Sequence, residues 1–148
     1  MKHILLLPLL AFPLLVCSCS SFERKWEAAV SDYQAGKTEG ISGPWAGAWT
    51  TNTNGHTGNL RAIVSESKKS PGNYDFHYHA TWAKIFSGGY RVSYPASRSG
   101  NTWKFDGEEK VGVFGTFRHR ATVTPHHFTA TYSSEKGDLG DFSMSRPR

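Results

Sequence analysis

Histidine is the residue type in this sequence that is best suited to binding a metal ion, and the chain contains 7 of them. His77 and His79 lie two positions apart, so a β-strand would point both side chains to the same face, a geometry that zinc and copper sites use. His126 and His127 form a second pair. Alternation places His77 and His79 on the outward face of their strand, where Asp75 is the nearest carboxylate. We therefore expect solvated surface histidines, no metal site and no cofactor.

Motifs that identify common catalytic sites are absent from the sequence. It contains no Gly-x-Ser-x-Gly, no His-Glu-x-x-His and no phosphate-binding glycine-rich loop. Acidic residues gather at predicted turns, as in Glu108-Glu109 and in Glu135 with Asp138, where solvated hairpin tips account for them. We therefore predict a protein without catalytic residues, with a hydrolase or isomerase site in the mouth of the fold as an alternative.

Residues 1–20 have the layout of a secretory signal, with a basic start and an apolar stretch too short to cross about 30 Å of hydrocarbon as a helix. Residues 16–19 (VCSC) resemble a bacterial lipobox, in which a small residue precedes an acylated cysteine, and Cys19 fits because Ser18 is small. The resemblance implies cleavage before Cys19, its acylation with chains such as palmitate, and a lipid anchor in the outer membrane of a bacterial envelope. The alternative is an ordinary signal peptide with incidental cysteines.

A short amphipathic helix is predicted directly after the acylated cysteine. Apolar residues follow helical spacing on one side of it, at Phe22, Trp26, Ala29, Val30 and Tyr33. Such a helix could lie on the membrane surface or pack on the folded domain, and we favour packing on the domain. Residues 38–43 (TEGISG) have the composition of a linker. The predicted organisation is a signal peptide at 1–18, a lipid-anchored tether with the helix at 19–43, and a β-domain at 44–148.

From residue 44 onward the apolar pattern has a period of two, and turn signals interrupt it at short intervals. This pattern predicts strands at 45–51, 59–65, 74–84, 89–94, 102–106, 115–123, 128–133 and 141–145. The connections are too short for crossover helices, so the sheet must be antiparallel. We predict an all-β fold, a single eight-stranded antiparallel up-and-down barrel, with a two-sheet sandwich as the alternative.

Alternation predicts an inner face that is crowded with aromatic rings. So many rings could fill a small barrel completely. Several inner residues nevertheless carry polar atoms, which need partners when they are buried. We therefore predict a modest cavity near the open end, with a ligand-binding lining of Tyr78, Tyr90, Tyr132 and His119.

Two short repeats open the first predicted strand, Gly43-Pro44-Trp45 and Gly47-Ala48-Trp49. They resemble the Gly-x-Trp signature of lipocalins and their calycin relatives, which include fatty-acid-binding, avidin-like and nitrobindin-like barrels. The resemblance implies that Trp45 or Trp49 closes one barrel end beneath Arg146, which follows the last predicted strand. The nitrobindin-like haem ligand near the C-terminus has no counterpart here, so haem binding is not implied. The whole chain is also similar to small lipoproteins of bacterial envelopes.

The formal net charge of +5 is modest. For an exported and lipid-tethered protein it does not predict nucleic-acid binding, and the expected partners are the membrane, through Cys19, and a small apolar ligand. We predict a monomeric, non-catalytic envelope lipoprotein that binds this ligand in its barrel. The alternative is a structural or interaction lipoprotein with a filled core, whose partner docks on an outer face around His77, His79, Arg118 and Arg120.

Overall fold

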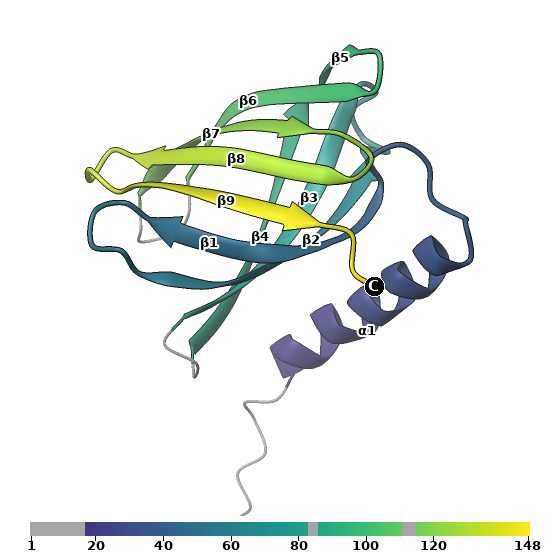
Figure 1. Cartoon of the computed structure of the whole chain (residues 1–148), viewed down its shortest axis with the longest axis horizontal. Coiled ribbons are helices and arrows are strands. Elements are labelled where there is room, and N and C mark those ends of the chain that lie inside the picture. The colour runs from purple at the N-terminus through teal and green to yellow at the C-terminus, as the bar shows by residue number, and fades with distance from the viewer. Residues whose placement is uncertain (1–16, 83–85, 111–114) are drawn as a thin grey trace, which may run out of the picture.

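The computed structural model describes residues 17–82, 86–110 and 115–148, in which one helix precedes a single antiparallel sheet (Figure 1). Positions 1–16 of the predicted signal peptide lie outside the described residues. The helix α1 spans Cys17–Gln34. The strands are β1 (Gly43–Thr51), β2 (Thr57–Glu66), β3 (Asn73–Trp82), β4 (Phe86–Pro95), β5 (Ser97–Ser99), β6 (Thr102–Lys110), β7 (Thr116–Val123), β8 (His127–Ser134) and β9 (Leu139–Ser145).

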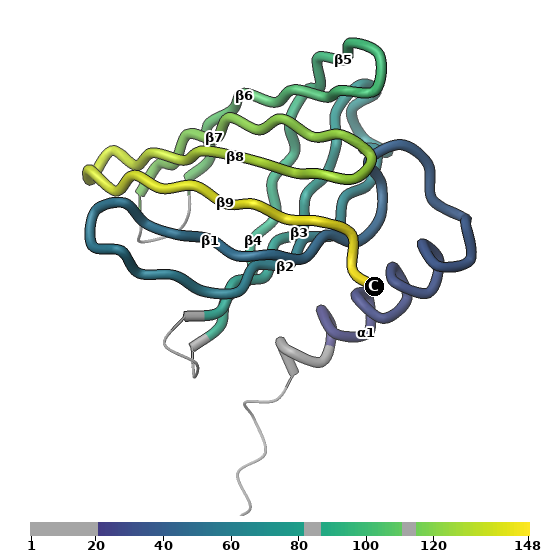
Figure 2. Tube along the Cα trace, viewed as in Figure 1, coloured from purple at the N-terminus to yellow at the C-terminus, as the bar shows by residue number. Residues whose placement is uncertain are grey.

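The strands curl into a nearly closed up-and-down barrel, which the chain trace follows in Figure 2. Their order in the sheet is β4-β3-β2-β1-β9-β8-β7-β6-β5, and all pairs are antiparallel. The first and last strands are neighbours, since Trp49 of β1 lies opposite both Gly58 of β2 and Phe142 of β9. Closure of the sheet on itself removes most exposed edges, and the up-and-down barrel predicted from the period-two pattern is confirmed.

The sheet has nine strands, so the prediction of eight was wrong by one. The additional strand is β5, three residues that pair with the start of β6. Its sequence lies between turn residues and resembles a loop, and only the tertiary context extends it. The guanidinium of Arg98 lies 4.4 Å from the ring centroid of Trp103, which holds the short strand against β6.

The remaining seam of the barrel lies between β4 and β6, which approach each other but form no hydrogen-bonded ladder among the described residues. Side chains close this seam. The ring of Tyr94 on β4 lies so close to Gly107 on β6 that a Cβ at residue 107 would overlap it. The Tyr94 hydroxyl then reaches His119 on β7, with 3.0 Å between its oxygen and Nδ1. A glycine opposite an aromatic ring thus substitutes here for backbone pairing.

The barrel end where β1 begins is filled by aromatic rings. Trp45 and Phe128 meet edge to face with their centroids 5.6 Å apart, and Phe76 and Phe105 do so at 5.0 Å. Trp45 and Phe128 are fully buried, and Phe76 and Phe105 nearly so. Edge-to-face pairs add about 0.5–1.5 kcal/mol each to the free energy of burial. The predicted ring-filled core is therefore present, but only at this end.

Helix α1 packs against the outside of the barrel rather than standing apart from it. Phe22 is 3% exposed and stacks on His79, with 4.7 Å between centroids, while its edge contacts His77 at 4.9 Å. Arg61 of β2 binds the carboxylate of Glu23 and covers the Phe22 ring. The expectation that His77 and His79 are solvated is therefore wrong, because an amphipathic helix covers that part of the outer face.

Burial changes the protonation of both histidines beneath the helix. It lowers the pKa of His77 to about 4, with the nearby charges of Arg91 and Lys25 acting in the same direction. Burial also lowers the pKa of His79, whose Nδ1 has no hydrogen-bond partner among the described residues. Both rings are therefore neutral at pH 7.

The segment between α1 and β1, predicted as a linker from its composition, contributes to the core. Ile41 is completely buried, and its carbonyl oxygen accepts a hydrogen bond of 2.9 Å from the indole Nε1 of Trp45. The barrel therefore extends its packing to residues before position 44. Among the helical residues that the structure describes, none forms a segment long and apolar enough to cross a membrane.

Candidate functional site

A cavity of about 400 Å³ opens at the end of the barrel opposite Trp45. It lies inside the sheet and receives side chains from both halves of the barrel. Its lining is almost entirely apolar and aromatic, and it consists of Trp49, Leu60, Ala80, Gly88, Gly89, Tyr90, Phe117, His119, Tyr132 and Phe142. Cavities of about 300–1,000 Å³ with such linings are typical of small-molecule sites.

The cavity exists because small residues meet across two strands of the barrel wall. Ala80 on β3 lies directly opposite Gly88 on β4, so neither strand sends a large side chain inward at this level. On the other side Ala80 faces Leu60 of β2. At the filled end, by contrast, the corresponding positions of these strands carry rings such as Phe76. Interiors without such gaps pack to a density that leaves almost no voids.

Two of the lining rings are held in fixed positions by hydrogen bonds to the backbone. The Tyr132 hydroxyl donates to the carbonyl of Thr50 at 3.3 Å, and the hydroxyl end of the ring lies so close to Gly140 that a Cβ there would overlap it. The indole Nε1 of Trp49 donates to the carbonyl of Thr81 at 3.2 Å. Aromatic rings that are anchored in this way form a preorganised wall and lose little conformational entropy when a ligand packs against them.

Tyr90 and Tyr78 form the wall on the β3–β4 side. Their rings stack with centroids 4.9 Å apart, and Tyr78 is almost completely buried behind Tyr90. Burial raises the pKa of both hydroxyls, so both are neutral at pH 7. Among the hydrogen bonds of the described residues, none involves the Tyr90 hydroxyl, which leaves this group available to a ligand.

His119 is the one lining residue with an imidazole ring, and it is 5% exposed. Burial lowers its pKa to about 4, so the ring is neutral at physiological pH. The Tyr94 hydroxyl lies 3.0 Å from Nδ1, and it has no other hydrogen-bonding partner among the described residues. The direction of this hydrogen bond depends on the tautomer of the ring: when the hydroxyl donates to Nδ1, the ring proton lies on Nε2.

The other end of the barrel is closed by Arg146. Its guanidinium lies 3.9 Å from the ring centroid of Trp45 and donates to the carbonyls of Pro125, Pro44 and Gly40, each at 3.1 Å. Burial lowers the pKa of Arg146 to about 10, which leaves it charged at neutral pH. Of the two tryptophans predicted as its partner, the structure places Trp45 beneath it.

The structure separates the predicted ligand-binding residues and the predicted closure residues Trp45 and Arg146, which lie at opposite ends of the barrel. Tyr90, Tyr132 and His119 line the cavity, and Tyr78 supports it from behind. Trp49 lines the cavity at the opposite end of β1 from Arg146. The sequence reasoning did not identify the facing pair Ala80 and Gly88, although two small residues among so many rings were the available signal. Cys19 lies in the first turn of α1.

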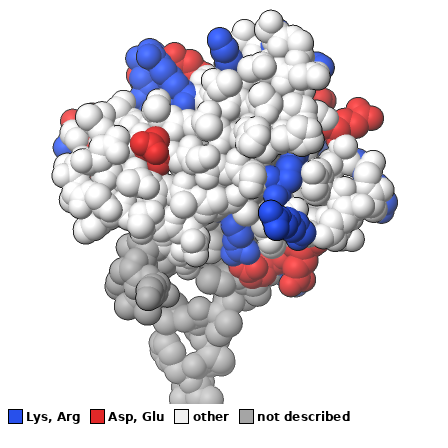
Figure 3. All heavy atoms as spheres, viewed as in Figure 1, with Lys and Arg blue, Asp and Glu red and all other residues white. Residues whose placement is uncertain are grey.

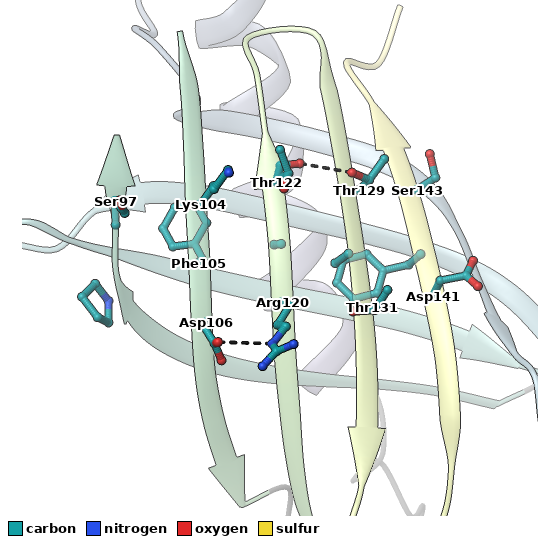
Figure 4. Close-up of a pocket in the computed structure, with 15 residues that line it drawn as sticks. Ser97, Lys104, Phe105, Asp106, Arg120, Thr122, Thr129, Thr131, Asp141 and Ser143 are labelled. Atoms are coloured by element: carbon teal, nitrogen blue, oxygen red, sulfur yellow. Dashed lines mark hydrogen bonds and ion pairs between the residues drawn. The ribbon is translucent and has the colours of Figure 1, made fainter. Parts of the chain in front are cut away.

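A second, shallower hollow of about 810 Å³ lies on the outer face of β5–β9 (Figure 4). Hydroxyl and charged side chains from neighbouring strands stand in rows across it, as in the series Lys104, Thr122, Thr129 and Ser143. Its charges are largely satisfied internally, since Asp106 lies 3.2 Å from Arg120 and also binds Arg118. These ion pairs lower the pKa of Asp106, with the hydrogen bond from Arg118 contributing most.

The outer surface predicted for a protein partner is not assembled as one patch. His77 and His79 lie on β3 beneath α1, whereas Arg118 and Arg120 lie on β7, where they bind Asp106. On the face shown in Figure 3, basic and acidic side chains form small groups separated by uncharged surface. Within residues 17–82, 86–110 and 115–148, no group of three or more His, Cys, Asp or Glu side chains could hold a metal ion.

No protein-family model and no curated protein sequence matches this chain. Its fold is similar to that of designed β-barrels among the solved structures. A redesigned β-barrel, mFAP1, bound to DFHBI has a TM-score of 0.54 at 16% identity, and the match covers 72% of this chain and 94% of that one. A second, mFAP0, also bound to DFHBI, has a TM-score of 0.55 at 14% identity and covers 73% and 100%. The likeness shows that the two folds are the same kind of barrel.

Proposed function

We propose that this protein is a non-catalytic, monomeric lipoprotein of the bacterial envelope that binds a small, mostly apolar ligand in the open end of its barrel. The observation that carries the proposal is the cavity of about 400 Å³ between Ala80, Gly88 and the anchored rings of Trp49 and Tyr132. A barrel with a filled core would bury these rings against one another and leave no space. The cavity therefore favours the binding role over the interaction lipoprotein with a filled core.

The designed barrels support this role by analogy of fold. Two of them, mFAP1 and mFAP0, were solved bound to DFHBI, so a barrel of this architecture is able to bind a small ligand. Barrels of about eight strands have interiors just wide enough for side chains or for one such ligand.

The chemistry of the cavity lining supports a role without catalysis. His119 is neutral, and its Nδ1 is occupied by Tyr94 instead of by a carboxylate that would make it a strong general base. The lining residues that the structure describes include no Ser, Cys, Asp, Glu or Lys that could act as a nucleophile or proton donor. A binding site has no need of such groups.

The lipid anchor rests on the sequence at Cys19 and on the position of α1. This helix includes Cys19 and continues directly into contacts with the barrel, through Phe22 on His79 and Tyr33 at Arg146. An acylated Cys19 would therefore hold the barrel close to the membrane surface rather than on a long flexible tether. Several acyl chains anchor a protein stably, where one binds only marginally.

Filling the cavity is expected to abolish ligand binding. In the Ala80→Phe variant the new ring would occupy the space between Leu60 and Gly88, so fatty acids and aromatic metabolites that raise the melting temperature of the intact chain should lose this effect. A ligand at a hundred times its Kd stabilises a protein by about 2.7 kcal/mol, which thermal denaturation detects readily. The matched control is Ala48→Phe, which adds the same ring at an exposed position on β1.

An equal response from the wild type, Ala48→Phe and Ala80→Phe proteins would mean that the compounds bind outside the cavity. No response of the wild type to any member of the panel would contradict the binding role itself.

Replacing Cys19 by Ala is expected to abolish acylation and to release the protein from membranes. Labelling with a palmitate analogue followed by membrane fractionation measures both effects. The Cys17→Ala variant is the control and should keep its lipid. If instead Cys17→Ala loses the label and Cys19→Ala retains it, the acylated residue is Cys17.

A further inference from the structure

The described residues that line the cavity in the barrel mouth carry polar atoms but no charge. None of them is Asp, Glu, Lys or Arg, and those that could ionise, namely His119, Tyr90 and Tyr132, are neutral at pH 7. An anion that enters such a site loses its hydration without gaining a counter-charge. Protonating His119 to supply that charge is unfavourable by a factor of about a thousand at pH 7, because its pKa is about 4.

Three of the rings beside the cavity share a common orientation. Tyr78, Tyr90 and His119 are nearly parallel, with interplanar angles of 25° between the two tyrosines, 17° between Tyr90 and His119, and 10° between Tyr78 and His119. A flat ring entering the cavity can lie parallel to this series and extend it by offset stacking, which is a preferred arrangement of aromatic pairs. A flexible alkyl chain gains nothing from this alignment.

The direction of hydrogen bonding in the site is set by Tyr94. Its hydroxyl crosses the seam between β4 and β6 and lies 3.0 Å from Nδ1 of His119. The described residues offer this hydroxyl no other hydrogen-bonding partner, so we assign the tautomer in which it donates to Nδ1 and the ring proton lies on Nε2. No hydrogen bond to Nε2 is formed among the described residues, and His119 lines the cavity. With this tautomer the site presents a donor that a ligand in the cavity can engage.

From these three observations we infer that the barrel binds an uncharged, planar aromatic molecule that carries a hydrogen-bond acceptor, with the acceptor bonded to Nε2 of His119. The inference rests on the proposed function, since it specifies the ligand of the same cavity. Tyr94 is a positioning residue in this arrangement, because it acts on the ligand only through the tautomer of His119.

Three naphthalenes of similar size distinguish the contributions of ring shape, hydrogen-bond acceptor and charge to ligand binding. They are 2-acetylnaphthalene, which is neutral with an acceptor, 2-ethylnaphthalene, which is neutral without one, and 2-naphthoate, which is an anion. Calorimetric titration of the full chain in nanodiscs measures their Kd values. The Ala80→Phe variant, whose cavity is filled, measures the heat of compound that enters the lipid, and this heat is subtracted. We expect 2-acetylnaphthalene to bind about 5–10-fold more tightly than 2-ethylnaphthalene, as one hydrogen bond predicts, and 2-naphthoate to bind at least 10-fold more weakly than 2-acetylnaphthalene.

Substitution of His119 tests the assignment of the donor. In His119→Phe the preference for 2-acetylnaphthalene over 2-ethylnaphthalene should fall to about one, while binding of 2-ethylnaphthalene persists. Nitrogen NMR of labelled histidine in the wild-type chain shows, without a substitution, which ring nitrogen of His119 carries the proton. The Nε2 resonance of His119 should have the shift of a protonated nitrogen and should move with 2-acetylnaphthalene but not with 2-ethylnaphthalene.

Equal affinity of the wild type for all three compounds, or tightest binding of 2-naphthoate, would overturn this inference and leave the binding role intact, provided that Ala80→Phe abolishes the signal. An unprotonated Nε2 would likewise overturn it. If the wild type binds none of the three compounds, both the inference and the proposed function are wrong.

Discussion

Replacing Trp45 by Ala is expected to lower the free energy of unfolding by about 3–5 kcal/mol, which is the range for large aromatic residues deleted from a core. Trp45 is completely buried, packs edge to face on Phe128, and donates a hydrogen bond to the Ile41 carbonyl. Its face also supports the guanidinium of Arg146 at 3.9 Å. The substitution therefore opens a void and removes the base on which the closing arginine rests.

Chemical denaturation followed by tryptophan fluorescence measures this loss. Domains of this kind are stable by only about 5–15 kcal/mol, so Trp45→Phe is a useful milder variant if Trp45→Ala does not fold. Arg146→Ala should cost less than Trp45→Ala, but measurably, because it loses three backbone contacts and the packing of its stem on Trp45.

The matched control is Trp49→Ala on the same strand. Trp49 is only partly buried and borders the cavity, so its removal enlarges an existing space and should cost clearly less than the removal of Trp45. If the two tryptophans cost the same, the filled end of the barrel is not where its packing energy is concentrated. If neither substitution changes the denaturation midpoint, the closure by Arg146 and Trp45 has no energetic role.

Lowering the pH from 7 to 5 is expected to cost about 2 kcal/mol of stability through His119 alone. The pKa of this residue is about 4 in the folded barrel against 6.5 in the unfolded chain. Between these values the unfolded chain binds a proton that the folded protein does not, so stability rises with pH. The stability is therefore full above about pH 6.5 and declines as the pH falls toward 4. His77 and His79, whose pKa values are also lowered, add to the loss.

Urea denaturation at pH 7, 6 and 5 measures this dependence. The range stops at pH 5 because Glu23 and Asp106, whose pKa values lie below their ordinary range, contribute only at lower pH. In His119→Phe the contribution of His119 to the pH dependence should disappear. The loss of unfolding free energy between pH 7 and pH 5 should therefore shrink by about 2 kcal/mol. A pH dependence that is identical in wild type and His119→Phe would show that His119 is not held neutral by the fold.

Several features of the protein follow from local sequence alone. The period-two pattern after residue 44 is a property of neighbouring residues, since successive side chains on a strand point to opposite faces. It was sufficient to predict an antiparallel barrel and the inward direction of Tyr90, Tyr132 and His119, while the helical spacing of apolar residues before residue 38 predicted the helix. The contact of Arg146 with a tryptophan of β1 was instead implied by the resemblance of the Gly-x-Trp repeats to lipocalins.

Other features depend on contacts between residues far apart in the chain, which no local pattern contains. The burial of His79 required Phe22 to pack across β3, and the strand character of β5 required Trp103 beneath Arg98. The contact between His119 and the hydroxyl of Tyr94 required Tyr94 to cross the unpaired seam between β4 and β6.

The cavity shows which features local sequence predicts and which features depend on tertiary structure. Alternation predicted that Ala80 faces inward, because side-chain direction follows from the strand period, whereas Gly88 lay outside the strand predicted at 89–94. Only the register of β3 on β4 decided that they lie opposite each other and leave a space between the rings, because register is set by turn geometry and by the packing of the whole inner face.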